Sequence, residues 1–141
     1  MLPGERQVAP ELSGIRRDHL ARYEWAARTL PPACSVVDLA CGVGYGAFVL
    51  AEAGHHVVAI DCDAEAIAYA REHYRHERVE YRVGIAGAVD LPAVDAAVCF
   101  ETIEHVDDPM PLLRALRTAA PMLLASVPNE NVMPYTGQAF H

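Results

Sequence analysis

The sequence has little positive charge. It contains 11 basic and 19 acidic side chains among 141 residues, and its formal net charge is −8 at pH 7. Proteins that bind long nucleic acids usually carry a basic stripe, whereas the basic run at residues 71–78 is interleaved with acidic, aromatic and histidine side chains. Long nucleic acid is therefore not expected as a partner, although a short RNA end, which needs only a few contacts, stays open.

A long apolar run is also absent. No stretch of 18 apolar residues occurs, and the N-terminus shows no basic segment followed by an apolar core and small residues. These absences predict neither a membrane span nor a signal peptide. We expect a cytoplasmic protein without membrane contact.

Paired cysteine spacing is missing as well. Cys34, Cys41, Cys62 and Cys99 form no metal-ligand pattern, and three of them fall in or beside apolar runs. A reduced cysteine in such a run behaves as a small core residue, so we interpret all four as structural thiols. We expect no metal site. His55, which follows a helix-ending glycine, is expected to be a surface residue.

What is present fits a single domain with a sizeable core. The chain is 52% hydrophobic and 21% charged. Apolar patterning predicts helices over residues 15–30, 45–53 and 64–73 and from Pro109, and strands over residues 36–40, 56–61, 79–83, 94–100 and 122–127. This alternation predicts an α/β fold, a Rossmann-like doubly wound parallel sheet with strand order 3-2-1-4-5. A ligand would bind at the carboxyl ends of strands 1, 2 and 4.

A glycine-rich turn follows the first predicted strand. Residues 36–47 read VVDLACGVGYGA, and Gly42, Gly44 and Gly46 permit close approach to the backbone, so a ligand can lie against it. Asp61 closes the next apolar run, 19 residues after Gly42. A carboxylate at that position is suited to accept hydrogen bonds from two ribose hydroxyls, so the pattern predicts a nucleoside cofactor.

Asp38 indicates which nucleoside cofactor the turn would bind. A carboxylate four residues before Gly42 repels a pyrophosphate and favours a cation. S-adenosylmethionine carries a sulfonium and an ammonium but no phosphate. A dehydrogenase stays as an alternative, because Gly42-x-Gly44-x-x-Ala47 also fits the looser dinucleotide fingerprint.

Asp38-x-Ala40-x-Gly42-x-Gly44 resembles the first motif of class I S-adenosylmethionine-dependent methyltransferases, with Ala40 in place of the first glycine. Other segments resemble the same family, in a branch often associated with small-molecule and surface-glycan modification: Glu5, Arg6, residues 19–23, 100–109 and 126–129. The family's complete sheet has seven strands. The resemblance thus implies a C-terminally truncated domain, with residues 1–32 as a helical lid and residues 33–141 as the cofactor-binding core. The alternatives are that a partner chain or a second copy covers the edge of strand five, or that the chain is a natural minimal version of the fold. Strand five would be an exposed apolar edge open to self-association.

The resemblance also implies a set of cofactor-binding residues. Ile85 stands where relatives often carry an acid facing the adenine amino group, so adenine recognition would depend on backbone near Ile85 or on Asp90. The full expected set is Asp38, Ala40, Cys41, Gly42, Gly44, Asp61, Cys62, Ile85, Ala86, Phe100 and Glu101.

Catalysis is expected from His105 and Glu104, just after the fourth strand. Aligning a nucleophile with the methyl group supplies much of the acceleration, and a base is needed only for a hydroxyl acceptor. His105 is the candidate base, because an imidazole titrates in the useful range. We therefore predict methyl transfer to a small-molecule or glycan acceptor at oxygen; His105 could alternatively serve only to pin its loop.

Two further hypotheses use the same features. Glu101-x-x-Glu104-His105 resembles the metal-binding segment of small-RNA 3′-end 2′-O-methyltransferases, and residues 128–131 loosely resemble their next motif. A non-catalytic S-adenosylmethionine-binding module is the other hypothesis.

Overall fold

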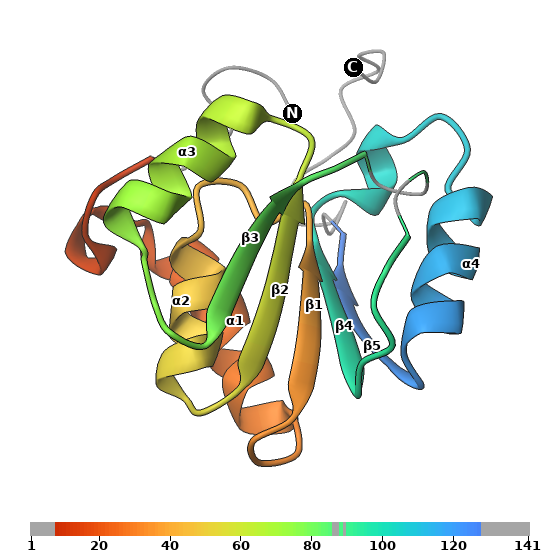
Figure 1. The fold of residues 1–141 in the computed structure, drawn as a ribbon, viewed down its shortest axis with the longest axis horizontal. Helices are drawn as coiled ribbons and strands as arrows, with labels where there is room; N and C mark the ends of the chain where they lie inside the picture. Colours follow the sequence, from red (N-terminus) through yellow and green to blue (C-terminus); the bar gives the residue numbers. More distant parts are fainter. Residues whose placement is uncertain (1–7, 86–87, 89, 128–141) are drawn as a thin grey trace.

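The computed structural model describes residues 8–85, 88 and 90–127 (Figure 1). Every predicted helix and strand is present in this part of the chain, with ends within two residues of those expected. The elements in chain order are η1 (Leu12–Gly14), α1 (Arg17–Thr29), β1 (Ser35–Leu39), α2 (Tyr45–Glu52), β2 (His56–Asp61), α3 (Ala64–His73), β3 (Val79–Val83), β4 (Ala96–Phe100), η2 (Ile103–His105), α4 (Met110–Ala119) and β5 (Met122–Ser126).

The five strands form one parallel sheet in the order β3-β2-β1-β4-β5, which confirms the predicted topology. The chain reverses its direction of winding after β1, so β1 lies between β2 and β4. In this register Asp38 lies opposite Ala59 of β2 and Val98 of β4. A switch point of this kind opens a crevice at the carboxyl ends of β1 and β4.

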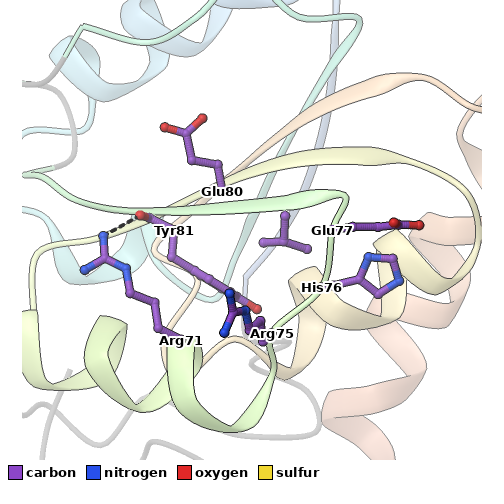
Figure 2. Close-up of a pocket in the computed structure, with 7 residues that line it drawn as sticks. Arg71, Arg75, His76, Glu77, Glu80 and Tyr81 are labelled. Atoms are coloured by element: carbon purple, nitrogen blue, oxygen red, sulfur yellow. Dashed lines mark hydrogen bonds between the residues drawn. The ribbon is translucent and has the colours of Figure 1, made fainter.

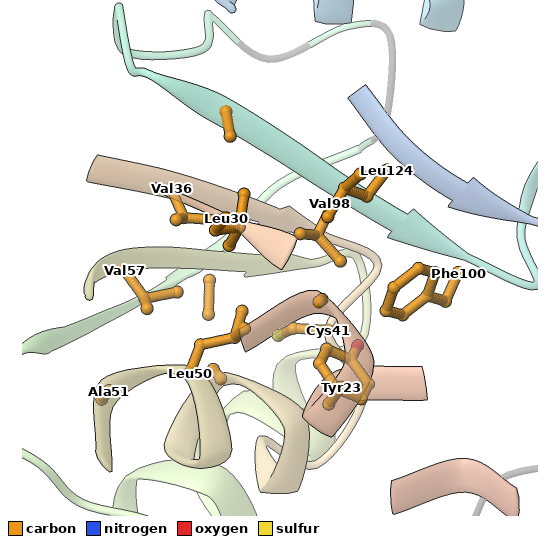
Figure 3. Packing of buried hydrophobic residues seen from close by; sticks show 14 of the residues in the cluster. Tyr23, Leu30, Val36, Cys41, Leu50, Ala51, Val57, Val98, Phe100 and Leu124 are labelled. Carbon is orange, nitrogen blue, oxygen red and sulfur yellow. The ribbon is translucent and has the colours of Figure 1, made fainter. Parts of the chain in front are cut away.

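Helices cover both faces of the sheet, with α1, α2 and α3 on one side and α4 on the other (Figure 1). The larger apolar cluster fills the space between the sheet and the first three helices, with Leu50 and Ile67 fully buried (Figure 3). A smaller cluster around Leu112 and Leu116 packs α4 on the opposite face. Burial on both faces explains why the inner strands are nearly continuous apolar runs.

An aspartate precedes each of two helices and accepts hydrogen bonds from backbone N–H groups of the first turn. Asp63 Oδ1 accepts hydrogen bonds from the backbone N–H groups of Glu65 and Ala66, at 2.9 and 3.4 Å, as expected for an N-cap. Asp108 Oδ1 accepts from the N–H of Met110 at 3.0 Å. Helix α4 begins at Met110, one residue later than predicted, and Pro109 is its N-cap residue.

Gly46 has a role other than ligand approach. A Cβ atom at this position would lie 2.1 Å from Cζ of Tyr23, so only glycine lets α1 pack this closely on α2. The prediction that all three glycines leave room for a ligand is wrong for Gly46.

His55 is buried, and the expectation of a surface residue is wrong. The backbone N–H of Cys34 donates to its Nδ1 at 3.3 Å, so Nε2 carries the proton and donates to the carbonyl of Ala27 at 3.1 Å. The imidazole thus ties the end of α1 to the starts of β1 and β2. Of the four cysteines, three are buried as expected and Cys62 is exposed.

The described part of the chain contains no helix that is both long and apolar enough to cross a membrane.

Candidate functional site

The turn after β1 bends through three left-handed residues: φ is +63° at Ala40, +61° at Gly42 and +97° at Gly44. The N–H of Cys41 donates to the carbonyl of Ile60 at 2.9 Å and holds the turn against β2. A Cβ at Gly42 would meet no described atom within 4 Å, so open space borders the backbone there. Ala40 adopts a conformation that costs an L-residue about 1 to 2 kcal/mol, which explains why glycine is the usual residue at this point of the motif.

Asp61 lies at the end of β2, beside this turn, and is buried. Its Oδ2 accepts from the N–H of Gly42 at 2.8 Å and its Oδ1 from the N–H of Asp63 at 2.9 Å. The carboxylate therefore fixes the glycine turn and the start of α3 in one place. A carboxylate oxygen can accept more than one hydrogen bond, so the predicted hydrogen bonds to ribose are compatible with this arrangement.

Asp38 is fully buried in β1, on the face covered by α1. Its Oδ1 accepts from the hydroxyl of Tyr23 at 3.2 Å, and its Oδ2 has no hydrogen-bond partner among the described residues. Burial raises the pKa of Asp38 to about 8; the Tyr23 hydrogen bond lowers the pKa and nearby Asp61 raises it further. A cation brought to this carboxyl group would favour its ionised form, whereas a phosphate would not.

The region predicted to face adenine is apolar and open. Val83 and Ile85, at and just beyond the end of β3, are exposed, as is Cys62 after β2. Asp90 is exposed too. The predicted residue Ala86 lies outside the described residues, as do Glu5, Arg6 and the segment 128–131.

The carboxyl end of β4 carries Phe100 and Glu101. Glu101 has a left-handed backbone, with φ of +50°, and its N–H donates to the carbonyl of Ser126 at 3.0 Å. Its Oε1 pairs with Nη2 of Arg22 at 3.0 Å, while its buried Oε2 has no partner in the described ranges. The ring of Phe100 packs edge-on against Tyr23, with centroids 5.0 Å apart.

Glu104 and His105 follow in η2. His105 Nε2 lies 3.4 Å from Glu104 Oε1, and both side chains are mostly buried. Neither carboxylate oxygen of Glu104 has a hydrogen-bond partner among the described residues. Burial raises the pKa of Glu104; the charge of Glu101 acts in the same direction, and His105 opposes it. The structure thus brings both predicted catalytic residues to the carboxyl edge of the sheet, beside Glu101.

A metal cluster is not seen in this region. Within residues 8–85, 88 and 90–127, no group of three or more His, Cys, Asp or Glu side chains could hold a metal ion. The guanidinium of Arg22 already neutralises Glu101.

Helix α1 brings side chains to the site that sequence reasoning gave no role. Arg22 reaches Glu101, Tyr23 reaches Asp38, and Nδ1 of His19 lies 3.2 Å from the hydroxyl of Tyr45, the first residue of α2. The signal was available in the sequence, because residues 19, 22 and 23 share one face of a helix. Their targets could not be read from it.

A separate pocket of about 750 Å³ lies at the other end of β3, against the end of α3 (Figure 2). Nη2 of Arg71 donates to the carbonyl of Tyr81 at 2.7 Å along its wall. The pocket borders the start of β3, and its lining residue Tyr81 also contacts the glycine turn, because its hydroxyl donates to the carbonyl of Gly44 at 3.3 Å. Its lining residues are Arg71, Arg75, His76, Glu77, Val79, Glu80 and Tyr81.

A parallel sheet with a switch point, a left-handed turn after β1 and a buried acid at the end of β2 defines a Rossmann-like nucleoside-binding domain. Residues 37–120 match the profile of the family described as "Methyltransferase domain". The chain belongs to this family, the class I S-adenosylmethionine-dependent methyltransferases, as predicted. The predicted cofactor, S-adenosylmethionine, is that of the family.

Curated relatives agree with this assignment. A "Probable S-adenosylmethionine-dependent methyltransferase" of Mycobacterium tuberculosis is 34% identical over 137 residues, which cover 91% of this chain and 48% of the relative. A "Ubiquinone biosynthesis O-methyltransferase" of Xanthomonas campestris pv. campestris is 32% identical over 117 residues, which cover 79% of this chain and 47% of the relative. The chain spans about half the length of these relatives.

The fold is similar to that of solved methyltransferases. The crystal structure of an S-adenosylmethionine-dependent methyltransferase from Mesorhizobium loti superposes with a TM-score of 0.61 at 28% identity, over 70% of this chain and 49% of that chain.

Proposed function

We propose that this protein transfers the methyl group of S-adenosylmethionine to a hydroxyl of a small-molecule or glycan acceptor. The observation that carries the cofactor assignment is the buried Asp38 carboxyl group, whose Oδ2 has no partner among the described residues. A site with this group beneath the glycine turn suits a cationic cofactor and penalises a pyrophosphate.

The geometry at the carboxyl edge of the sheet supports the remaining cofactor contacts that we propose. The backbone of residues 40–44 would lie against the cofactor, since the space beside Gly42 is open. Asp61 would accept the ribose hydroxyls, and the exposed Cys62 and Ile85 would border adenine. Phe100 and Glu101, at the end of β4, would border the methionine part.

At the acceptor side, His105 would serve as the general base or orient the acceptor, and Glu104 would hold its ring through the 3.4 Å contact. The bound cofactor supplies an electrophilic methyl group, so these residues need only to place the acceptor oxygen and manage its proton. Oxygen is supported as acceptor atom by the name of the Xanthomonas relative. The net charge of −8 favours a small acceptor over long nucleic acid.

The test combines binding and turnover. By calorimetry, S-adenosylhomocysteine should bind more tightly than NAD; the reverse order would contradict the cofactor assignment. With methyl-labelled S-adenosylmethionine and a panel of phenols, catechols and sugar hydroxyls, label should reach at least one acceptor class. His105→Ala should lower this turnover by roughly 10² and leave S-adenosylhomocysteine affinity unchanged.

One observation supports a second candidate, metal-dependent 2′-O-methylation of an RNA 3′ end. Three buried carboxylate oxygens, on Glu101 and Glu104, have no hydrogen-bond partner among the described residues, and Glu104 Oε1 lies 3.4 Å from Nε2 of His105. If a chelator abolishes turnover and a divalent ion restores it, this candidate replaces the first. Binding of the cofactor without turnover on either small acceptors or short RNA would instead favour the non-catalytic module.

A further inference from the structure

We propose that Tyr45 and His19 form a proton relay on the helix side of the acceptor site, in which Tyr45 contacts the acceptor hydroxyl and His19 takes the proton through Tyr45. This proposal rests on the proposed transfer to oxygen and assigns the base within it. His105, on the β4 side, then orients the acceptor.

The relay is defined by one contact and its place in the fold. His19 Nδ1 lies 3.2 Å from Oη of Tyr45, and both side chains are partly accessible. Tyr45 comes directly after Gly44 of the glycine turn, so its backbone is fixed where α2 begins. One turn further along α1, Arg22 pairs with Glu101 at the end of β4. The pair therefore borders the same edge as the glycine turn and the β4 terminus.

Protonation states favour donation from Tyr45 to His19. Burial raises the pKa of Tyr45 to about 12, with Asp38 acting in the same direction, so its hydroxyl keeps its proton at neutral pH. Burial lowers the pKa of His19, so its imidazole is neutral there and can accept at Nδ1. Tyr45 Oη has no other hydrogen-bond partner in the described part of the chain.

The charges facing the pair come from several elements. Asp18 and Glu101 raise the pKa of His19, whereas Arg22 and Arg16 lower it. Around Tyr45, the other contributors are Asp38 on β1, Arg22 and Asp18 on α1, and Tyr74 beyond α3. The carboxylates near His19 would stabilise the imidazolium that forms when it accepts a proton.

In the proposed relay, two proton transfers accompany the transfer of the methyl group. The O–H bond of the acceptor breaks and its proton passes to Tyr45 Oη, while the proton of Tyr45 passes to His19 Nδ1. The acceptor oxygen uses the freed electron pair to bond the methyl carbon, and the electron pair of the broken carbon–sulfur bond stays on sulfur. His19 then returns its extra proton to solvent.

The first test is an NMR titration of the histidine side chains and needs no turnover. Wild-type His19 should show the neutral Nε2–H tautomer, with Nδ1 accepting. Tyr45→Phe removes a hydrogen bond to the neutral imidazole and should raise the titration midpoint of His19. Tyr69→Phe is the matched control, because Tyr69 stacks on His73 of α3, away from this edge, and should leave His19 unchanged. An Nδ1–H tautomer, or an unmoved midpoint in Tyr45→Phe, would overturn the relay.

The second test is the pH profile of kcat/KM with the acceptor that is turned over best. His19→Ala and Tyr45→Phe should each lower kcat by roughly 10² and remove the acidic limb of the profile. The double variant should be no worse than either single variant, since the two groups act as a unit. S-adenosylhomocysteine affinity should stay within about twofold, which separates loss of the relay from misfolding, and His73→Ala should match wild type.

The outcomes separate the two proposals. If the acidic limb survives in His19→Ala and vanishes in His105→Ala, His105 is the base; the relay is then wrong and transfer to oxygen stands. If no hydroxyl acceptor is methylated while S-adenosylhomocysteine binds, the proposed function fails and the relay fails with it.

Discussion

Asp61 joins a structural and a predicted binding role in one side chain. Its two oxygens hold the backbone of Gly42 and Asp63, so the carboxylate shapes the turn even before any ribose contact is considered. The sequence predicted the residue and its place at the end of β2. It could not predict these two hydrogen bonds, because they depend on how the turn folds back across the strand.

Asp61→Ala should weaken S-adenosylhomocysteine binding at least tenfold, because each hydrogen bond to a charged group contributes about 1.5 to 3 kcal/mol. Calorimetry gives the affinity and circular dichroism checks the fold. Asp108→Ala, which removes a hydrogen bond to the first residue of α4 and lies outside the glycine turn, is the control and should retain wild-type affinity. Unchanged binding in Asp61→Ala would mean that the ribose is held elsewhere.

Asp38 makes the stability of the chain depend on pH. With a pKa of about 8 when folded and the ordinary value near 3.8 when unfolded, the folded chain binds more protons between pH 4 and 8. The free energy of unfolding therefore falls as pH rises through this window and is highest below it. The group that suits a cationic cofactor thus costs stability at neutral pH.

Asp38→Asn should remove this pH dependence and raise the free energy of unfolding near pH 8 by roughly 1 to 5 kcal/mol, as measured by urea titration. The same variant should lose affinity for S-adenosylmethionine more than for S-adenosylhomocysteine, which lacks the sulfonium charge. Asp90→Asn, at an exposed site, should keep the wild-type slope. Equal slopes for Asp38→Asn and wild type would contradict a buried, protonated Asp38.

Among the secondary-structure elements, α1 links the N-terminal segment to the site. Its inward face reaches the carboxyl edge through Arg22 and Tyr23 and the opposite edge through the Ala27 carbonyl bound by His55. The helix was predicted from its apolar stripe, and the idea of a lid over residues 1–32 stays a prediction. The close packing on α2 depends on Gly46.

Gly46→Ala should destabilise the chain by about 1 to 3 kcal/mol, because the added methyl group would overlap the ring of Tyr23. Chemical denaturation measures the loss. In a double-mutant cycle, Tyr23→Leu should recover part of it, since the smaller side chain makes room. Ala68→Gly, at an exposed position of α3, controls for the general cost of a change at a helical glycine or alanine. Additive effects in the cycle would show that the two residues do not compete for space.

At the scale of the whole molecule, the sheet formed by the described residues has two edge strands, β3 and β5. Met122 and Leu123 of β5 are exposed, and so is Val127 just beyond the strand. An apolar edge strand with unpaired backbone groups is a template for association with another chain. We retain self-association through β5 as a prediction for this 141-residue chain.

Light scattering of the 141-residue chain should show a mass that rises with concentration. Leu123→Lys should suppress this rise, because a charge on the edge opposes pairing. Trp25→Lys, at an equally exposed apolar position on α1, should not. A concentration-independent monomer mass for the wild-type chain would contradict the prediction.

The sequence by itself determined the elements, their order in the sheet and the position of the glycine turn. These follow from local patterns: apolar runs of strand length, helical spacing and a turn rich in glycine, together with the right-handed crossovers that parallel strands require. It also placed Asp38, Asp61, Glu101, Glu104 and His105 at the carboxyl edge, because strand ends in a parallel sheet share one edge.

Tertiary structure alone decided which of these groups meet. Segments that are distant in the chain come together in four places: around Asp38, whose Oδ2 is left without a described hydrogen-bond partner, around the buried His55, at the close contact of Gly46 with Tyr23, and where His19 approaches Tyr45. Such contacts depend on the angle and depth at which α1 packs on α2 and the sheet. That packing is set by the sum of many side-chain volumes in the core, and no local pattern of residues records it.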